Sequence, residues 1–198
     1  MLKLIIPPPL KQEFATVEAL WHSTGETRRV DSLVLSWVKY EKQLRRLFCF
    51  LVYQHPNITE KNISVVIDIL AQNRFLYPET FIRAIKALGV KSVPDLIGPR
   101  HAELAKEISR IKEYRNKLIH GQITGLGIQS IQLERAVKWI IEWVSCLARG
   151  AEAAFGYDGL KRNTFRAAKA ATCIAAEDFP FSTPAEFRAW LEGVAKGG

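Results

Sequence analysis

Apolar residues recur every three or four positions through most of this chain, and no stretch alternates apolar and polar residues as a half-buried strand does. The pattern is clearest in residues 130–154, where one stripe contains Leu133, Val137, Ile140, Val144 and Leu147. Such spacing places side chains on one face of an α-helix. The sequence therefore predicts an all-α fold.

Capping residues, glycines and prolines divide the pattern into segments. We expect helices at Leu10–Trp21, Asp31–Gln54 with Asp31 as N-cap, Thr59–Asn73, Pro78–Leu88, Pro99 or Arg100–Gly121, Ser130–Ala154 and Asn163–Ala176, and a last short helix starting at Ser182-Thr183-Pro184. Val90–Gly98 is expected to be a connecting segment, and Gly89 to end the helix before it. The faces expected to point inward include Ile63, Val66, Ile67, Leu70, Phe81, Ile85 and Leu88.

Composition limits the class of protein. A formal charge of +8 and a pI near 9.5 favour polyanionic partners such as RNA or DNA. Cys49, Cys146 and Cys173 are few and far apart, which predicts neither disulfides nor a metal knuckle and fits a cytoplasmic location. The prolines after Ile6 interrupt the apolar start too early for a secretory signal, and no apolar run reaches membrane-spanning length. We expect one soluble domain with terminal additions, no membrane contact and no cofactor.

Arg115, Asn116 and His120 are the residues that indicate chemistry, because they stand close together near the end of the helix that closes at Gly121. A guanidinium matches phosphate oxygens, and an imidazole moves protons near neutral pH. Arg115 continues the apolar stripe formed by Leu104, Ile108, Ile111 and Leu118, whereas Asn116 and His120 share a different face. The three groups could cleave a phosphodiester without a metal ion.

Glu41 interrupts the apolar stripe of residues 31–54, which otherwise contains Val34, Trp37, Leu44, Phe48 and Leu51. A charge that points toward a core needs an opposite charge. We therefore predict that Glu41 pairs with Arg115 as a supporting residue.

The Arg-Asn-x-x-x-His run, preceded by a helix of the Trp37-x-x-x-Glu41-x-x-Leu44-Arg45 kind, resembles HEPN domains. The resemblance covers residues 31–155 and leaves an arm, 1–30, and a helical extension, 156–198, expected to pack on the same domain. It implies an up-and-down helical bundle that forms a homodimer in which both subunits line one cleft. It also implies metal-independent cleavage of RNA, in which Arg115 holds the scissile phosphate, His120 assists proton transfer at the 2′-hydroxyl and Asn116 orients them.

The resemblance further implies that the products carry 2′,3′-cyclic phosphate and 5′-hydroxyl ends. Related proteins serve as ribonuclease toxins with a cognate antitoxin or regulator, as antiphage effectors or as RNA-processing factors, while some bind RNA or protein without cleaving anything. A catalytically inactive HEPN-like module and a basic helical scaffold are therefore the rival hypotheses.

Each candidate also has a structural interpretation. Arg115 could instead form a buried ion pair that holds two helices in register. His120 could instead interact with the dipole at the C-terminus of its helix. Lys112 and Lys117 flank the motif and are the candidate RNA-phosphate contacts. Trp139 and Trp143 are interpreted as core or dimer contacts rather than as base-stacking residues. The glycine-rich residues 121–127 lack a Walker lysine, so a turn is favoured over a nucleotide-binding loop.

Overall fold

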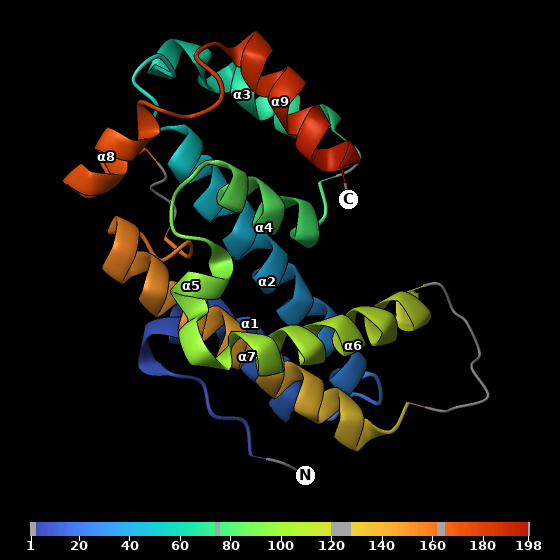
Figure 1. The fold of residues 1–198 in the computed structure, drawn as a ribbon. Helices are drawn as coiled ribbons and strands as arrows, with labels where there is room; N and C mark the ends of the chain where they lie inside the picture. Colours follow the sequence, from blue (N-terminus) through green and yellow to red (C-terminus); the bar gives the residue numbers. More distant parts are fainter. Residues whose placement is uncertain (1–2, 74–75, 120–127, 162–164, 198) are drawn as a thin grey trace. The chain divides into compact units, whose positions relative to one another are not determined.

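The computed structural model describes residues 3–73, 76–119, 128–161 and 165–197. These residues form helices and connecting segments, and no strand occurs among them (Figure 1). The predicted all-α helical bundle class is confirmed.

The helices follow the predicted order, with some changes in their bounds. They are α1 (Lys11–His22), α2 (Arg28–Val52), α3 (Ile63–Gln72), α4 (Pro78–Ala87), α5 (Val93–Ile97), α6 (His101–Ile119), α7 (Ser130–Phe155), α8 (Ala170–Ala176) and α9 (Pro184–Lys196). Short 3-10 segments precede α1, α3 and α6 at Pro8–Leu10, Glu60–Asn62 and Gly98–Arg100.

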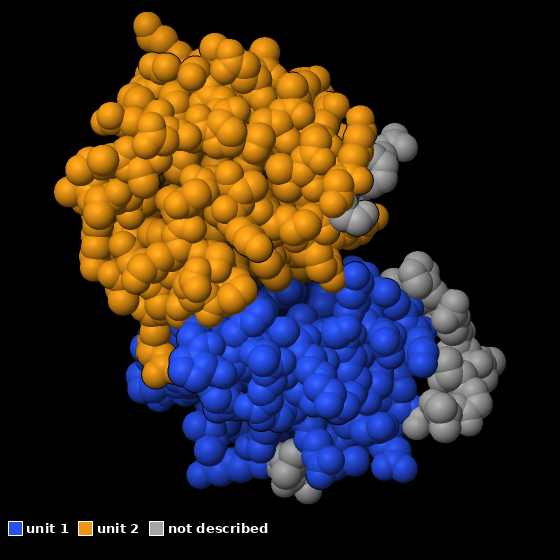
Figure 2. All heavy atoms as spheres, in the orientation of Figure 1, with its two compact units in different colours: residues 1–40, 97–146 blue, residues 41–96, 147–198 orange. Residues whose placement is uncertain are grey.

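The chain divides into two compact units (Figure 2). Unit 1 comprises residues 1–40 and 97–146, and unit 2 comprises residues 41–96 and 147–198. Helices α2 and α7 each begin in unit 1 and end in unit 2.

Unit 1 is held by an apolar core to which α1, the first half of α2, α6 and the first part of α7 all contribute. Its fully or nearly fully buried side chains include Phe14, Val17, Trp21, Leu33, Trp37, Tyr40, Leu104, Ile111, Val137, Ile140 and Trp143. The ring of Tyr40 lies 5.0 Å from that of Trp37 and meets Trp143 edge-on at 5.8 Å. Burying an aromatic or branched side chain of this size stabilises a fold by about 1.5–3 kcal/mol. The α1 segment is therefore part of this core.

A buried ion pair joins α2 to α7 inside unit 1. Nε of Arg29 lies 2.7 Å from a carboxylate oxygen of Glu134, and both side chains are less than a tenth exposed. The same guanidinium donates to the Trp21 carbonyl at 2.9 Å and stands 4.4 Å from the centre of the Trp21 ring. One arginine thus connects the end of α1, the start of α2 and the start of α7.

In unit 2, α9 packs against α3 and α4 through an aromatic cluster. Phe48 lies 5.6 Å from Phe81 and 6.1 Å from Phe187, and Phe181 meets Phe187 edge-on at 5.0 Å. Gly150 of α7 meets the backbone of α5 so closely that an added Cβ would stand 1.9 Å from the Leu96 carbonyl oxygen. Only glycine fits at this crossing.

The predicted start of α2 is wrong. The helix begins at Arg28, which places Asp31 in the first turn instead of at the N-cap. The backbone N–H of Asp31 already donates to the Thr27 carbonyl at 3.0 Å, and its carboxylate accepts from the Thr27 hydroxyl at 2.8 Å. Asp31 therefore supports the first turn from within the helix.

Two other segments also differ from expectation. Residues 93–97 of the expected connector form the short helix α5, whose start is fixed by hydrogen bonds between Ser92 and Asp95. The alanine-rich helix begins only at Ala170, because the side chain of Gln54 holds the preceding backbone by accepting from the Ala168 N–H at 2.8 Å and donating to the Arg166 carbonyl at 3.2 Å. A local contact decides the first segment, and a side chain more than a hundred residues away decides the second.

The inward faces of α3 and α4 are mostly as predicted. Val66, Leu70, Phe81, Ile85 and Leu88 are buried and Ile63 is partly buried, whereas Ile67 is half exposed and Ile69 takes its place in the core. Gly89 follows α4 with a φ of 75°, as expected for a residue that ends a helix. Thr183 caps α9 by accepting from the backbone N–H of Glu186 at 3.2 Å.

Candidate functional site

The candidate site is built on α6 of unit 1. Leu104, Ile108 and Ile111 are buried along one face of this helix, and Arg115 follows one turn later with its side chain partly buried. Helical spacing predicted Arg115 inside the apolar stripe, and the structure leaves its side chain only partly buried there.

Arg115 and Asn116 are in direct contact. Nη1 of Arg115 donates a hydrogen bond to Oδ1 of Asn116 at 2.9 Å. The Nε of Arg115 is buried and has no hydrogen-bond partner among the described residues. A buried donor without a partner is costly, so this nitrogen is not fully satisfied by the described residues.

His120 lies outside the described residues, which on α6 end at Ile119. Lys112 is exposed and Lys117 partly exposed, and both occupy the last turns of the helix, as predicted. Glu41 belongs to unit 2 and Arg115 to unit 1, so the pairing of these two side chains stays a prediction.

A groove of about 400 Å³ lies between α6 and α7 within unit 1, and we call it the α6–α7 groove. Both helices are labelled in Figure 1, and residues of each line the groove. From α6 the lining residues are Glu107, Arg110, Ile111 and Tyr114, and from α7 they are Gln132, Arg135, Ala136 and Trp139. Ile111 and Ala136 are buried, while the other six are partly or fully exposed.

Sequence reasoning missed this groove. Trp143 is only 1% exposed, as expected of a core residue, but Trp139 is partly exposed and its ring lines the groove. The sequence held one indication of the groove, because residues 107, 110, 111 and 114 have helical spacing and so share one face of α6 next to Arg115. The groove therefore adjoins the motif, because Tyr114 directly precedes Arg115.

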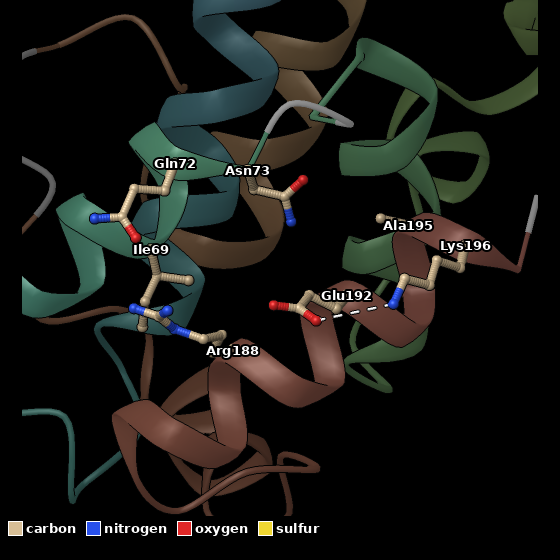
Figure 3. A pocket seen from close by; sticks show the side chains of 7 residues that line it. All are labelled: Ile69, Gln72, Asn73, Arg188, Glu192, Ala195 and Lys196. Atoms are coloured by element: carbon tan, nitrogen blue, oxygen red, sulfur yellow. Dashed lines mark ion pairs between the residues drawn. The ribbon is translucent and has the colours of Figure 1, made fainter.

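A second cavity of about 400 Å³ lies in unit 2 between α3 and α9 (Figure 3). Arg188, Glu192 and Lys196 line it from α9, and Gln72 and Asn73 from the end of α3. Lys196 and Glu192 form an exposed ion pair at 4.0 Å. None of the residues predicted to be functional lies here, and exposed pairs of this kind contribute little energy.

Two histidines in the described residues have a perturbed pKa. Burial lowers the pKa of His101, whose ring lies 5.7 Å from that of Trp143 in unit 1. Burial also lowers the pKa of His55 in unit 2, where Nδ1 accepts from the backbone N–H of Asn57 at 3.1 Å. His55 is buried and His101 is partly buried, and neither lines the α6–α7 groove or contacts Arg115.

Within the described part of the chain, no three His, Cys, Asp or Glu side chains gather as metal ligands do. None of the helices described combines the length and the apolar character that crossing a membrane requires. Comparison with models of protein families, with curated proteins and with solved structures finds no match to this chain.

Proposed function

We propose that this protein is a metal-independent endoribonuclease of the HEPN type, in which Arg115, Asn116 and His120 act on the scissile phosphate. The observation that carries the proposal is the contact between Arg115 and Asn116 at 2.9 Å on the last turns of α6, next to the position where His120 follows. The proposed activity, RNA cleavage, is inferred from the resemblance of this motif to HEPN domains.

The chemistry requires three groups. Attack of the ribose 2′-oxygen on phosphorus forms the cyclic phosphate and breaks the bond to the 5′-oxygen, so one proton leaves the 2′-hydroxyl and one reaches the leaving oxygen. His120 is proposed to assist this proton transfer. Arg115 stabilises the charge on the phosphate oxygens, and Asn116 fixes the guanidinium by accepting from Nη1.

The lack of an ion pair between Arg115 and any carboxylate of the described residues supports this assignment, because its side-chain hydrogen bond goes to Asn116 instead. An arginine whose purpose is an ion pair within unit 1 would have its donors satisfied by a carboxylate there, whereas a phosphate-binding arginine keeps donors available for its ligand. Lys112 and Lys117 would add phosphate contacts that read no sequence.

The decisive experiment is incubation of the purified chain with total RNA in EDTA, followed by analysis of the product ends. We expect cleavage with 2′,3′-cyclic phosphate and 5′-hydroxyl ends, and we expect Arg115→Ala and His120→Ala to abolish it. Lys106→Ala removes a charge from the same helix, and His22→Ala removes an exposed histidine of unit 1, so these two variants should cleave normally.

Loss of activity in the Arg115 and His120 variants counts only if their circular dichroism spectra match that of the parent chain. Absence of cleavage by the parent chain, or undiminished cleavage by folded His120→Ala, contradicts the nuclease proposal. The former result would favour a HEPN-like module that binds RNA or a partner protein without cleaving.

The resemblance also leads us to propose that the protein works as a cytoplasmic homodimer with a composite site, of the kind found in toxins and antiphage effectors that a cognate antitoxin or regulator controls. Sedimentation equilibrium tests the dimer. A strictly monomeric chain at micromolar concentration would contradict the composite site but not RNA binding by one subunit.

A further inference from the structure

The α6–α7 groove carries an inference about how the substrate is held. We propose that it binds one nucleotide of a single-stranded RNA, with the base against Tyr114 and Trp139 and the backbone phosphate beside Arg135. This inference rests on the proposed function, because it specifies the substrate that reaches the same end of α6.

The size of the groove suits a single nucleotide. Its volume of about 400 Å³ lies in the range of small-molecule sites, roughly 300–1,000 Å³. It is partly open, and its two buried lining residues, Ile111 and Ala136, are apolar. A flat base fits such a slot, whereas a paired base in an A-form duplex presents only its edge to a protein.

The two rings in the groove are not core residues. Trp143, one turn after Trp139, is 1% exposed and packs on Tyr40 and His101. Trp139 is partly exposed and packs differently, since the guanidinium of Arg100 lies 6.0 Å from the centre of its ring. Part of the Trp139 ring therefore remains in the groove together with Tyr114, and exposed aromatic rings are the surfaces on which unpaired bases stack.

The two arginines that line the groove, Arg110 and Arg135, differ in whether a carboxylate neutralises them. Arg110 lies 3.1 Å from Glu107 and donates to both of its carboxylate oxygens, so that pair is largely neutralised. Arg135 is exposed and forms no ion pair with a carboxylate among the described residues. The groove therefore offers one uncompensated cation, which attracts a phosphate.

Gln132 supplies a polar contact for a base edge. Its Oε1 accepts from the backbone N–H of Gln129 at 2.7 Å, which leaves the amide nitrogen as a donor. The groove also leads toward the motif, since Tyr114 and Arg115 are consecutive and Arg110 and Arg115 are separated by about 7.5 Å along the helix axis. One strand can therefore occupy the groove and reach Arg115.

The probe for this inference is a fluorescently labelled single-stranded RNA in which every 2′-oxygen is methylated, because it cannot be cleaved through that oxygen. Its binding to the full chain is measured by anisotropy over a range of salt concentrations. We expect Tyr114→Ala to weaken binding at least about fivefold through lost stacking, and Tyr114→Phe to bind like the parent chain. Arg135→Ala should lower the slope of log affinity against log salt by about 0.7.

Matched exchanges in unit 2 provide the controls. Tyr77→Ala removes an exposed tyrosine and Arg188→Ala an exposed arginine, and both variants should bind the probe like the parent chain. If Arg188→Ala weakens binding as much as Arg135→Ala, total charge rather than the groove explains affinity and the inference is overturned. Equal affinity for a duplex of the same sequence overturns it as well.

Failure of this inference is distinguishable from failure of the nuclease proposal. Binding that depends on Tyr114 and Arg135 in a chain that cleaves no RNA refutes the nuclease and leaves the groove assignment intact. Cleavage that requires His120, with unchanged probe binding in the Tyr114→Ala and Arg135→Ala variants, overturns the groove assignment alone.

Discussion

The buried pair of Arg29 and Glu134 allows a quantitative test of the unit 1 packing. Removing one partner of a buried ion pair leaves an uncompensated charge and typically costs about 3–5 kcal/mol. In Glu134→Ala, Arg29 would keep its hydrogen bond to the Trp21 carbonyl and its place over the Trp21 ring, but neither neutralises its charge. We expect the free energy of unfolding to fall by about 3–5 kcal/mol.

Urea denaturation followed by far-ultraviolet circular dichroism measures this loss. Glu142→Ala is the matched control, because it breaks an ion pair with Arg100 in which both side chains are more than two fifths exposed. That control should cost about 0–1 kcal/mol. The double variant Arg29→Met with Glu134→Leu should be more stable than either single variant, since it leaves no buried charge. Equal losses for Glu134→Ala and Glu142→Ala would refute the reasoning.

Three further predictions concern unit 2. Gly150→Ala should destabilise the protein by at least about 1–3 kcal/mol, because the new methyl group meets the Leu96 carbonyl. Gly193→Ala should stabilise it by about 0.5–1 kcal/mol, because α9 has open space at that position. Thermal unfolding of both variants measures these changes. Burial lowers the pKa of His55, so the folded state binds fewer protons than the unfolded chain below about pH 6.5. The free energy of unfolding should therefore fall as the pH is lowered from that value. Urea midpoints measured over this pH range should vary less in His55→Gln than in the parent chain. Burial raises the pKa of Cys49 to about 12, so iodoacetamide should modify it more slowly at neutral pH than it modifies glutathione, as followed by mass spectrometry.

The fold could be predicted where helical periodicity alone decides it. The stripe of α7 that begins at Leu133 is buried along its whole length, and the predicted end of the helix differs from the observed Phe155 by one residue. Prediction failed where a distant side chain competes with local preference. The alanines around Ala168 favour a helix, but Gln54 binds that backbone from more than a hundred residues away.

The candidate site was predictable in part for the same reason. Helical spacing placed Arg115 within the apolar stripe of α6, and the structure has its side chain only partly buried there, in contact with the neighbouring Asn116. The groove beside it could not be found from one helix, because Tyr114 and Trp139 come from segments that only the tertiary packing brings together. Trp139 and Trp143 look equivalent in the sequence and differ in burial for that reason.

The passage of α2 and α7 from one unit into the other has a consequence for biosynthesis. Unit 1 contains segments 1–40 and 97–146, so a ribosome must synthesise residue 146 before all of its parts exist, and unit 2 is incomplete until residues 147–198 have been made. Neither unit can fold as the chain emerges in the way that consecutive domains do. A nonsense mutation just after residue 146 would release a chain that lacks the second of the two segments of unit 2. We expect chaperones to retain such a chain and proteases to degrade it.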